Sequence, residues 1–135
     1  MTAGPSAVPV LVVDDQAPFR LAARSVIRRA EGFDLVGEAA TGEEAVEVVG
    51  DLAPALVLMD INMPGINGIE ATRRIVAAHP EIVVFLCSTY ALADLPPDAA
   101  TSGARAYVNK EELSPTLIAD LWSRRADGFA ATNGE

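Results

Sequence analysis

The sequence has one cysteine, no long hydrophobic run and few basic residues. The single cysteine, Cys87, excludes an internal disulfide and is typical of a reducing compartment. The longest apolar runs, "ALVLM" and "IVVFLC", are far too short to span a bilayer. The first residues, "MTAGPSA", have neither the basic region nor the apolar stretch of a signal peptide. These absences predict a cytoplasmic protein that makes no contact with a membrane.

The charge is one-sided, with 10 basic against 19 acidic residues and a net charge of −9. An acidic surface repels phosphates, so direct nucleic-acid binding by this domain is not expected. The chain has 135 residues and is 50% hydrophobic. That length and composition suit one ordinary domain with a real core, and not two.

Short apolar runs alternate with amphipathic segments along the chain. Strands are predicted over 8–13, 33–39, 55–60, 82–87 and 104–109. Helices are predicted over 18–30, from a Thr41 capping box to Pro54, up to His79-Pro80, and over 115–126 behind a Ser114-Pro115 cap. Because strand and helix alternate and several strands are almost wholly aliphatic, the pattern predicts an α/β fold with a doubly wound parallel sheet.

The predicted domain covers 8–126, with a disordered tail at 1–7 and a loose C-terminal tail at 127–135. One connection stands out inside the domain. The segment 91–103 is rich in Ala, Asp and Pro and has room only for a short helix after Pro96-Pro97.

Polar side chains follow the apolar strands at their carboxyl ends. Asp14 and Asp15 end the first strand and Asp60 ends the third, while Ser88 and Lys110 follow the fourth and fifth. In an open parallel sheet these ends meet at one crevice, which is where such folds bind ligands. The sequence therefore predicts that three carboxylates, a hydroxyl and an ammonium converge on one site.

This set of groups suits magnesium and a phosphoryl group. Mg²⁺ accepts carboxylate and carbonyl oxygens and retains waters, and the tight loop "DINMPGING" can turn the backbone carbonyl of Asn62 toward it. Lys110 adds a positive charge suited to phosphate, and the Ser88 hydroxyl can donate to a phosphoryl oxygen. Asp60 can then act as the nucleophile and form an aspartyl phosphate.

Four motifs make the chain resemble a known family. "VVDD", "LMDINMPGINGIEA", Ser88-Thr89 and "AYVNK" resemble the receiver domain of bacterial two-component response regulators, which is CheY-like, from Val8 to Ala126. Such domains have a flavodoxin-like (βα)5 sandwich with a five-stranded parallel sheet of order 2-1-3-4-5. The resemblance therefore implies that fold, and a signalling switch that catalyses only its own phosphorylation and dephosphorylation.

The resemblance also implies roles for individual residues. Asp60 is the phosphoacceptor and Lys110 contacts the phosphoryl group. Asp15 coordinates Mg²⁺ directly, Asp14 mainly through water, and the Asn62 backbone carbonyl is a further ligand, with Asp60 completing the metal site.

Two further residues and the partners follow from the same resemblance. Ser88 rotates toward the new phosphate and Tyr107 follows it as the aromatic switch residue. The implied phosphodonor is the phosphohistidine of a sensor histidine kinase in a phosphorelay, and a phosphorylation-dependent homodimer is a possible consequence. The downstream protein target is unknown.

The chain departs from the family pattern at two places near the site. Glu111 follows Lys110 where the family usually has proline, so a cis peptide bond is not expected there. Tyr90 stands two residues after Ser88, where a bulky ring can hinder water that attacks the phosphate. On the first predicted helix, Arg20, Arg24 and Arg28 form a basic stripe that is either a solvated face or a kinase-docking surface.

Other functions fit the sequence less well. A haloacid dehalogenase-type phosphatase needs an acidic residue at position 62, which is Asn62 here, and a flavodoxin-like electron carrier needs a phosphate loop where the chain has "DDQAPF". The short polar end favours a stand-alone single-domain regulator. The alternative is the N-terminal receiver of a helix-turn-helix transcriptional regulator, which "LVGEAATGEEAV" resembles.

Overall fold

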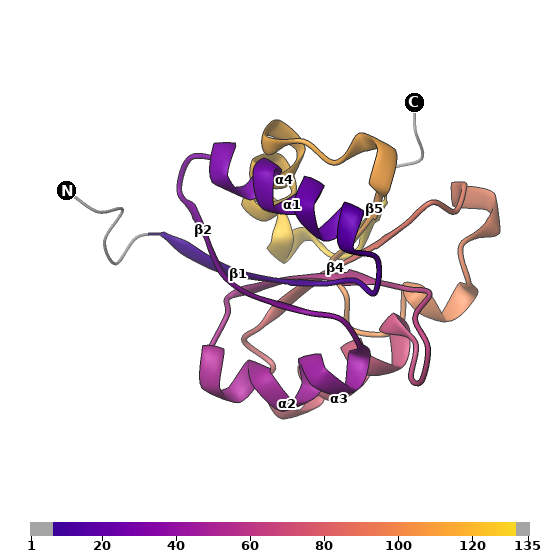
Figure 1. The fold of residues 1–135 in the computed structure, drawn as a ribbon. Coiled ribbons are helices and arrows are strands. Elements are labelled where there is room, and N and C mark those ends of the chain that lie inside the picture. The colour runs from indigo at the N-terminus through magenta and orange to yellow at the C-terminus, as the bar shows by residue number, and fades with distance from the viewer. Residues whose placement is uncertain (1–6, 132–135) are drawn as a thin grey trace.

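The computed structural model describes residues 7–131 and has three layers, with a central sheet between two pairs of helices (Figure 1). The strands are β1 (Val8–Val13), β2 (Phe33–Ala39), β3 (Leu56–Asp60), β4 (Val83–Ser88), β5 (Ala106–Asn109) and β6 (Ala130–Ala131). All neighbours pair in parallel, in the order β2-β1-β3-β4-β5-β6. The predicted doubly wound parallel α/β fold is therefore confirmed.

Four α-helices cover the sheet. They are α1 (Ala17–Arg29), α2 (Gly42–Leu52), α3 (Gly68–Ala78) and α4 (Pro115–Ser123). In Figure 1, α1 and α4 lie on one face of the sheet, and α2 and α3 lie on the other. None of the helices in the described part of the chain is long and apolar enough to cross a membrane.

The central strands are buried because helices cover both of their faces. Every residue of β3 and β4 is buried, as are the last four residues of β1. Alternate side chains of a strand point to opposite faces, so the core divides into two clusters. Leu11, Val57 and Val84 belong to the cluster under α2 and α3, whereas Val10 and Leu58 belong to the cluster under α1 and α4.

The helix starts follow the predicted caps. Thr41 Oγ1 accepts from the Glu44 amide at 3.0 Å, and Glu44 Oε1 accepts from the Ala40 amide at 2.9 Å. Ser114 Oγ accepts from the Leu117 amide at 3.0 Å and starts α4. These side chains accept hydrogen bonds from backbone amides that have no partner inside the helix. They therefore fix the residue at which each of these helices begins.

One prediction needs correction at the β5 side of the sheet. The sheet has a sixth strand where a loose tail was predicted, because Ala130 and Ala131 pair with Ala106 and Tyr107. The segment 91–103, predicted to have room only for a short helix after Pro96-Pro97, has the short 3-10 helix η3 (Pro97–Ala99) there and a second one, η2 (Leu92–Asp94), before it. A two-residue strand carries no periodic signal, which is why the sequence did not predict it.

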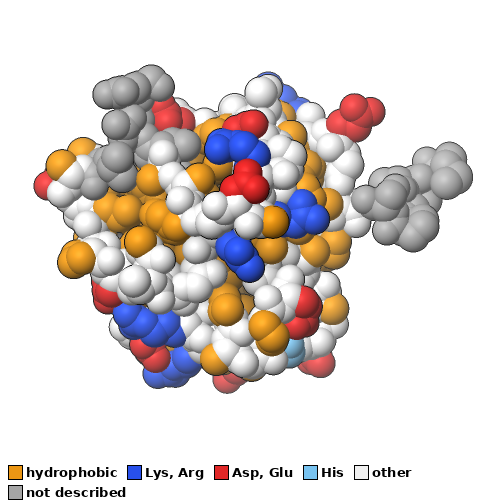
Figure 2. All heavy atoms as spheres, turned by 180° about the vertical axis from the view of Figure 1, so that it is seen from behind, with side chains coloured by type: hydrophobic (Ala, Val, Ile, Leu, Met, Phe, Trp, Pro, Cys, Tyr) orange, Lys and Arg blue, Asp and Glu red, His pale blue; other side chains and the backbone are white. Residues whose placement is uncertain are grey.

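Figure 2 shows the side opposite to Figure 1, where hydrophobic side chains gather in one patch. Phe129, just before β6, packs on the same core cluster as Leu95 of the η2–η3 connection. The apolar side chains beside β6 therefore cover part of the core next to the β4–β5 connection, which has 3-10 turns in place of an α-helix.

Candidate functional site

Three carboxylates meet at the carboxyl ends of β1 and β3. Asp14, Asp15 and Asp60 each offer an oxygen, and these oxygens all lie within 4.8 Å of one another. Asp14 is fully buried and Asp60 is 4% exposed, whereas Asp15 faces solvent. The parallel topology brings Asp60 beside the first pair, as predicted, although 45 residues separate it from Asp15.

The ammonium group of Lys110 forms ion pairs with two of these carboxylates. Lys110 Nζ lies 2.7 Å from Asp14 Oδ2 and 3.3 Å from Asp60 Oδ1. The contact with Asp14 Oδ2 is an ion pair without hydrogen-bond geometry, so this buried oxygen has no aligned donor among the described residues. Burial lowers the pKa of Lys110, but Asp14 and Asp60 outweigh it and raise that pKa overall. Lys110 is therefore a fixed positive charge in the pocket.

The surroundings favour the charged form of Lys110 but disfavour the charged form of the Asp60 carboxyl. The pKa of Asp60 is raised to about 6, mainly by burial; Lys110 opposes this rise, and the charges of Asp14 and Asp15 add to it. A carboxylate held in this way is less stable than one in water. A further cation in the pocket would remove that disadvantage.

The loop after Asp60 is built around close backbone contacts. The Gly68 amide donates to the Ile61 carbonyl at 2.8 Å, and a Cβ at Gly68 would collide with the Asp60 carbonyl oxygen. Glu43 in the first turn of α2 accepts from the Ile66 amide at 3.0 Å. Gly68 thus lets the start of α3 press directly against the strand that ends in Asp60.

Ser88 ends β4, and the Tyr107 side chain reaches it from β5, where Tyr107 is in register with Leu86. Ser88 is 2% exposed, and its Oγ accepts from the Tyr90 amide at 3.4 Å. Tyr107 is fully buried, and its hydroxyl donates to the carbonyls of Ser88 at 3.1 Å and Tyr90 at 2.7 Å. Burial raises the pKa of Tyr107 to about 12, so its hydroxyl keeps its proton.

These groups surround a hollow of about 140 Å³ lined by Gln16, Asp60, Asn62, Ser88, Thr89 and Lys110. Tyr90 connects two of the segments that line it, because its hydroxyl donates to Asn62 Oδ1 at 3.1 Å and its backbone amide donates to Ser88 Oγ. The volume is large enough for a hydrated ion or a phosphoryl group and too small for a nucleotide.

Two contributors were missed from the sequence. The ring of Phe19 lies 4.4 Å from Lys110 Nζ, and the Gln16 amide donates to Asp14 Oδ1 at 2.8 Å. Phe19 was predicted only as a core residue of a helix, because its period matches one. The sequence gives no signal for the Phe19–Lys110 contact or for the Gln16–Asp14 hydrogen bond. Both depend on how the start of α1 is placed beside the pocket.

The lysine turn and the basic stripe also have definite structures. No cis peptide bond occurs within residues 7–131, as expected at Glu111. Arg20 and Arg24 both pair with Glu38, at 3.6 Å and 2.8 Å, and Arg20 also donates to the Asp14 carbonyl at 2.6 Å. Part of the stripe therefore holds α1 against β2 and the Asp14 turn. Kinase docking by these arginines stays a prediction.

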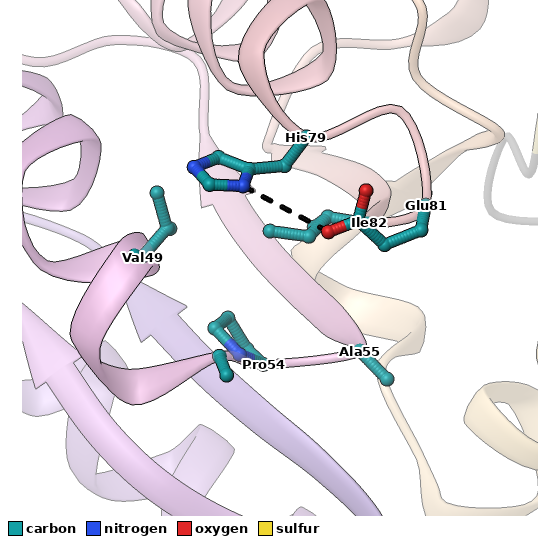
Figure 3. Close-up of a pocket in the computed structure, with 8 residues that line it drawn as sticks. Val49, Pro54, Ala55, His79, Glu81 and Ile82 are labelled. Carbon is teal, nitrogen blue, oxygen red and sulfur yellow. Dashed lines mark ion pairs between the residues drawn. The ribbon is translucent and has the colours of Figure 1, made fainter.

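A larger hollow, of about 340 Å³, lies at the opposite end of the sheet (Figure 3). It is lined mainly by small and apolar residues from the ends of α2 and α3, including Val49, Pro54 and Ile82. His79 Nδ1 lies 3.8 Å from Glu81 Oε2 at its rim. This hollow has no cluster of carboxylates and no lysine, so it lacks the groups for phosphoryl chemistry.

Comparisons with known proteins agree with this geometry. The model of the response regulator receiver domain matches residues 10–121. The chemotaxis protein CheY of Thermotoga maritima is 38% identical over 115 residues, which are 85% of this chain and 94% of that protein. The response regulator GacA of Pseudomonas viridiflava is 37% identical over 103 residues, or 76% of this chain and 48% of that protein. The chain thus spans about half the length of relatives of the GacA kind.

Solved structures show the same fold. A two-component response regulator of the LuxR family from Aurantimonas sp. SI85-9A1 superposes with a TM-score of 0.82 at 29% identity, covering 96% of this chain and 91% of that one. The response regulator domain of Thermotoga maritima CheB gives a TM-score of 0.78 at 30% identity, covering 89% and 97%. The sixth strand is the difference between this sheet and the predicted order.

Proposed function

Because the chain belongs to the response regulator receiver domain family, we propose that its acidic pocket makes it a phosphorylation-activated switch with Asp60 as the phosphoacceptor. The observation that carries the proposal is the meeting of three carboxylates with one ammonium group in a hollow of phosphoryl size. Receiver domains are signalling switches and not classical enzymes. The chemistry proposed here is limited to the protein's own phosphorylation and dephosphorylation.

The proposed step is a phosphoryl transfer from the phosphohistidine of a sensor histidine kinase. A carboxylate oxygen of Asp60 attacks the phosphorus, the P–N bond to the histidine breaks, and its electron pair returns to the imidazole. An aspartyl phosphate and a free histidine result. The pocket favours the step by placing positive charge where negative charge gathers.

Asp14, Asp15 and Asp60, with the Asn62 carbonyl, would hold Mg²⁺ in this pocket. Their oxygen donors suit a hard divalent cation, and the buried Asp14 Oδ2 without an aligned donor supports the assignment. Asp15 faces solvent and suits direct coordination, with Asp14 acting mainly through water. Bound Mg²⁺ supplies charge neutralisation for the transferring phosphoryl group.

Lys110 and Ser88 complete the pocket from the other side. Lys110 is already within 3.3 Å of Asp60 Oδ1, so it can follow the phosphoryl group onto that oxygen. Ser88 lines the same hollow, and its hydroxyl can rotate to donate to a phosphoryl oxygen.

Tyr107 is the proposed switch residue. Its hydroxyl bonds two carbonyls of the segment that begins at Ser88, so a shift of Ser88 toward phosphate disturbs the contacts that hold the ring. Two states of one buried ring are a suitable element for added charge to bias.

The setting follows from the family and remains part of the proposal. We place the protein in the cytoplasm of a bacterium, with a sensor histidine kinase as its donor. It acts as a stand-alone regulator by protein contact, or as the receiver of a longer LuxR-type regulator such as those it resembles. A phosphorylation-dependent homodimer is compatible with either.

Labelling with acetyl phosphate and Mg²⁺, read by intact mass, tests the proposal. We expect the parent protein to gain one phosphoryl group and Asp60→Asn to gain none, with the fold of the variant intact. Labelling that persists in Asp60→Asn would contradict the assignment of the phosphoacceptor. Multiple turnover of a phosphomonoester by the parent would favour a phosphatase instead.

A further inference from the structure

Asn109 occupies an unusual position at the end of β5, directly before Lys110. It is a polar side chain that is only 7% exposed, and both ends of its amide are used. Oδ1 accepts from the Glu111 amide at 2.9 Å, and Nδ2 donates to the Tyr90 carbonyl at 3.2 Å. One side chain therefore joins two segments that both border the pocket.

The first bond fixes the turn that carries the lysine. Lys110 opens the 3-10 turn η4 (Lys110–Glu112), which Asn109 caps and which the Leu113 amide closes on the Lys110 carbonyl at 3.4 Å. A capped turn has one direction, and the direction of this turn decides where the Lys110 stem points. That stem ends between Asp14 and Asp60.

The second bond fixes the end of the segment from Ser88 to Tyr90, of which Ser88 and Thr89 line the pocket. The Tyr90 carbonyl accepts from Asn109 Nδ2 and also from the Tyr107 hydroxyl. The Tyr90 ring then extends to Asn62, on the Asp60 loop. Tyr90 is thus held at its main chain by β5 and at its hydroxyl by the opposite wall.

We propose that Asn109 is a positioning residue that makes the lysine turn and the Tyr90 segment move as one unit. The inference rests on the proposed phosphoryl chemistry and adds a residue that acts through the Glu111 amide and the Tyr90 carbonyl. When the unit is intact, Lys110 is aimed at Asp60 and the Tyr90 ring shields the pocket from water. Loss of the first bond slows phosphorylation, and loss of the second exposes the aspartyl phosphate to water.

Two substitutions separate the bonds. Asn109→Ala removes both. Asn109→Ser keeps a hydroxyl that can cap the turn at the Glu111 amide but is too short to reach the Tyr90 carbonyl. Three quantities are measured for each variant. They are the labelling rate with acetyl phosphate at saturating Mg²⁺, the hydrolysis rate of the phosphorylated protein, and the Mg²⁺ affinity by calorimetry.

We expect Asn109→Ala to be labelled about tenfold more slowly, as the loss of one or two buried hydrogen bonds in the transition state implies. Asn109→Ser should be labelled at nearly the parental rate but should lose its phosphoryl group about 2–10-fold faster, which corresponds to one hydrogen bond. Mg²⁺ affinity should not change in either variant, because the two bonds of Asn109 that are removed go to the Glu111 amide and the Tyr90 carbonyl, and neither goes to a carboxylate.

Ser102→Ala is the matched control. Ser102 is 5% exposed, and its Oγ donates to the Ala99 carbonyl at 2.7 Å and accepts from the Ala104 amide at 3.2 Å, before β5 begins. Ser102→Ala removes two buried hydrogen bonds as well, but in the connection that precedes β5 and away from the pocket. We expect lower thermal stability and parental rates.

Three results would overturn the inference: parental rates in Asn109→Ala, equal slowing in Asn109→Ala and Ser102→Ala, or a loss of Mg²⁺ affinity in step with the labelling rate. Each is obtained only when the parent protein is labelled. A parent that is not labelled at all would overturn the proposed function itself, and the role of Asn109 with it.

Discussion

Two hollows lie at opposite ends of one sheet, and of these two the smaller one has the groups for phosphoryl chemistry. At the amino ends, about 340 Å³ is lined mainly by small and apolar side chains. At the carboxyl ends, about 140 Å³ holds Asp60, whose pKa is raised, beside Lys110 and buried Asp14. The functional site is therefore marked by charged groups whose pKa values are shifted by their surroundings. The volume of a hollow is a poor guide to it.

The first way to test this contrast is to remove the positive charge. Lys110 is the only lysine of the chain. Lys110→Ala should slow labelling by acetyl phosphate about 10²–10³-fold, because it removes a charge aimed at the transferring group. Lys110→Arg keeps the positive charge but spreads it over a planar guanidinium group. Its labelling rate should lie between those of the parent and Lys110→Ala. If Lys110→Ala were labelled at the parental rate, the positive charge at this end of the sheet would have no part in phosphorylation.

The second test removes a metal ligand. Asp15→Asn should weaken Mg²⁺ binding about 10–100-fold without unfolding the domain, since Asp15 is exposed and the loss is one charged ligand. Asp51→Asn is the matched control, because Asp51 is an exposed acid of α2, the helix whose end borders the other hollow. Equal weakening by both variants, measured by calorimetry, would mean that Mg²⁺ responds only to overall charge.

The third test uses the raised pKa of Asp60. In metal-free protein the folded state binds this proton more tightly than the unfolded chain, so stability from this group falls as pH rises through about 6. Asp60→Asn should therefore be more stable than the parent at pH 7 by about 1–3 kcal/mol, with the difference shrinking toward pH 4. Urea unfolding with a chelator measures this difference. A constant difference over that pH range would contradict the shift.

The smallest effect is expected at the apolar end. Ile82 is 5% exposed and lines the larger hollow. Ile82→Val should lower the free energy of unfolding by about 0.5–1.5 kcal/mol, because it deletes one buried methylene. The labelling rate should stay parental, so a slower rate in Ile82→Val would show that the two ends are coupled.

The same contrast explains what could be predicted from the sequence. Asp14, Asp60 and Lys110 were predictable because aliphatic strands mark the sheet and parallel topology gathers their carboxyl ends. The roles of Phe19 and Asn109 were not, because each depends on the conformation of a turn. Strand β6 was missed for a related reason, since a segment of two residues has no hydrophobic period.

The short strand β6 also provides a place from which to observe the protein. Ala131 is exposed and lies in register with Tyr107, and Cys87 is buried with its pKa raised by burial to about 12. In Ala131→Cys, a thiol-reactive dye would therefore attach at the new position and leave the native thiol alone. Such a dye would sit on the strand beside the switch residue with no flexible linker between them. The edge of the sheet thus offers an optical readout of the buried ring.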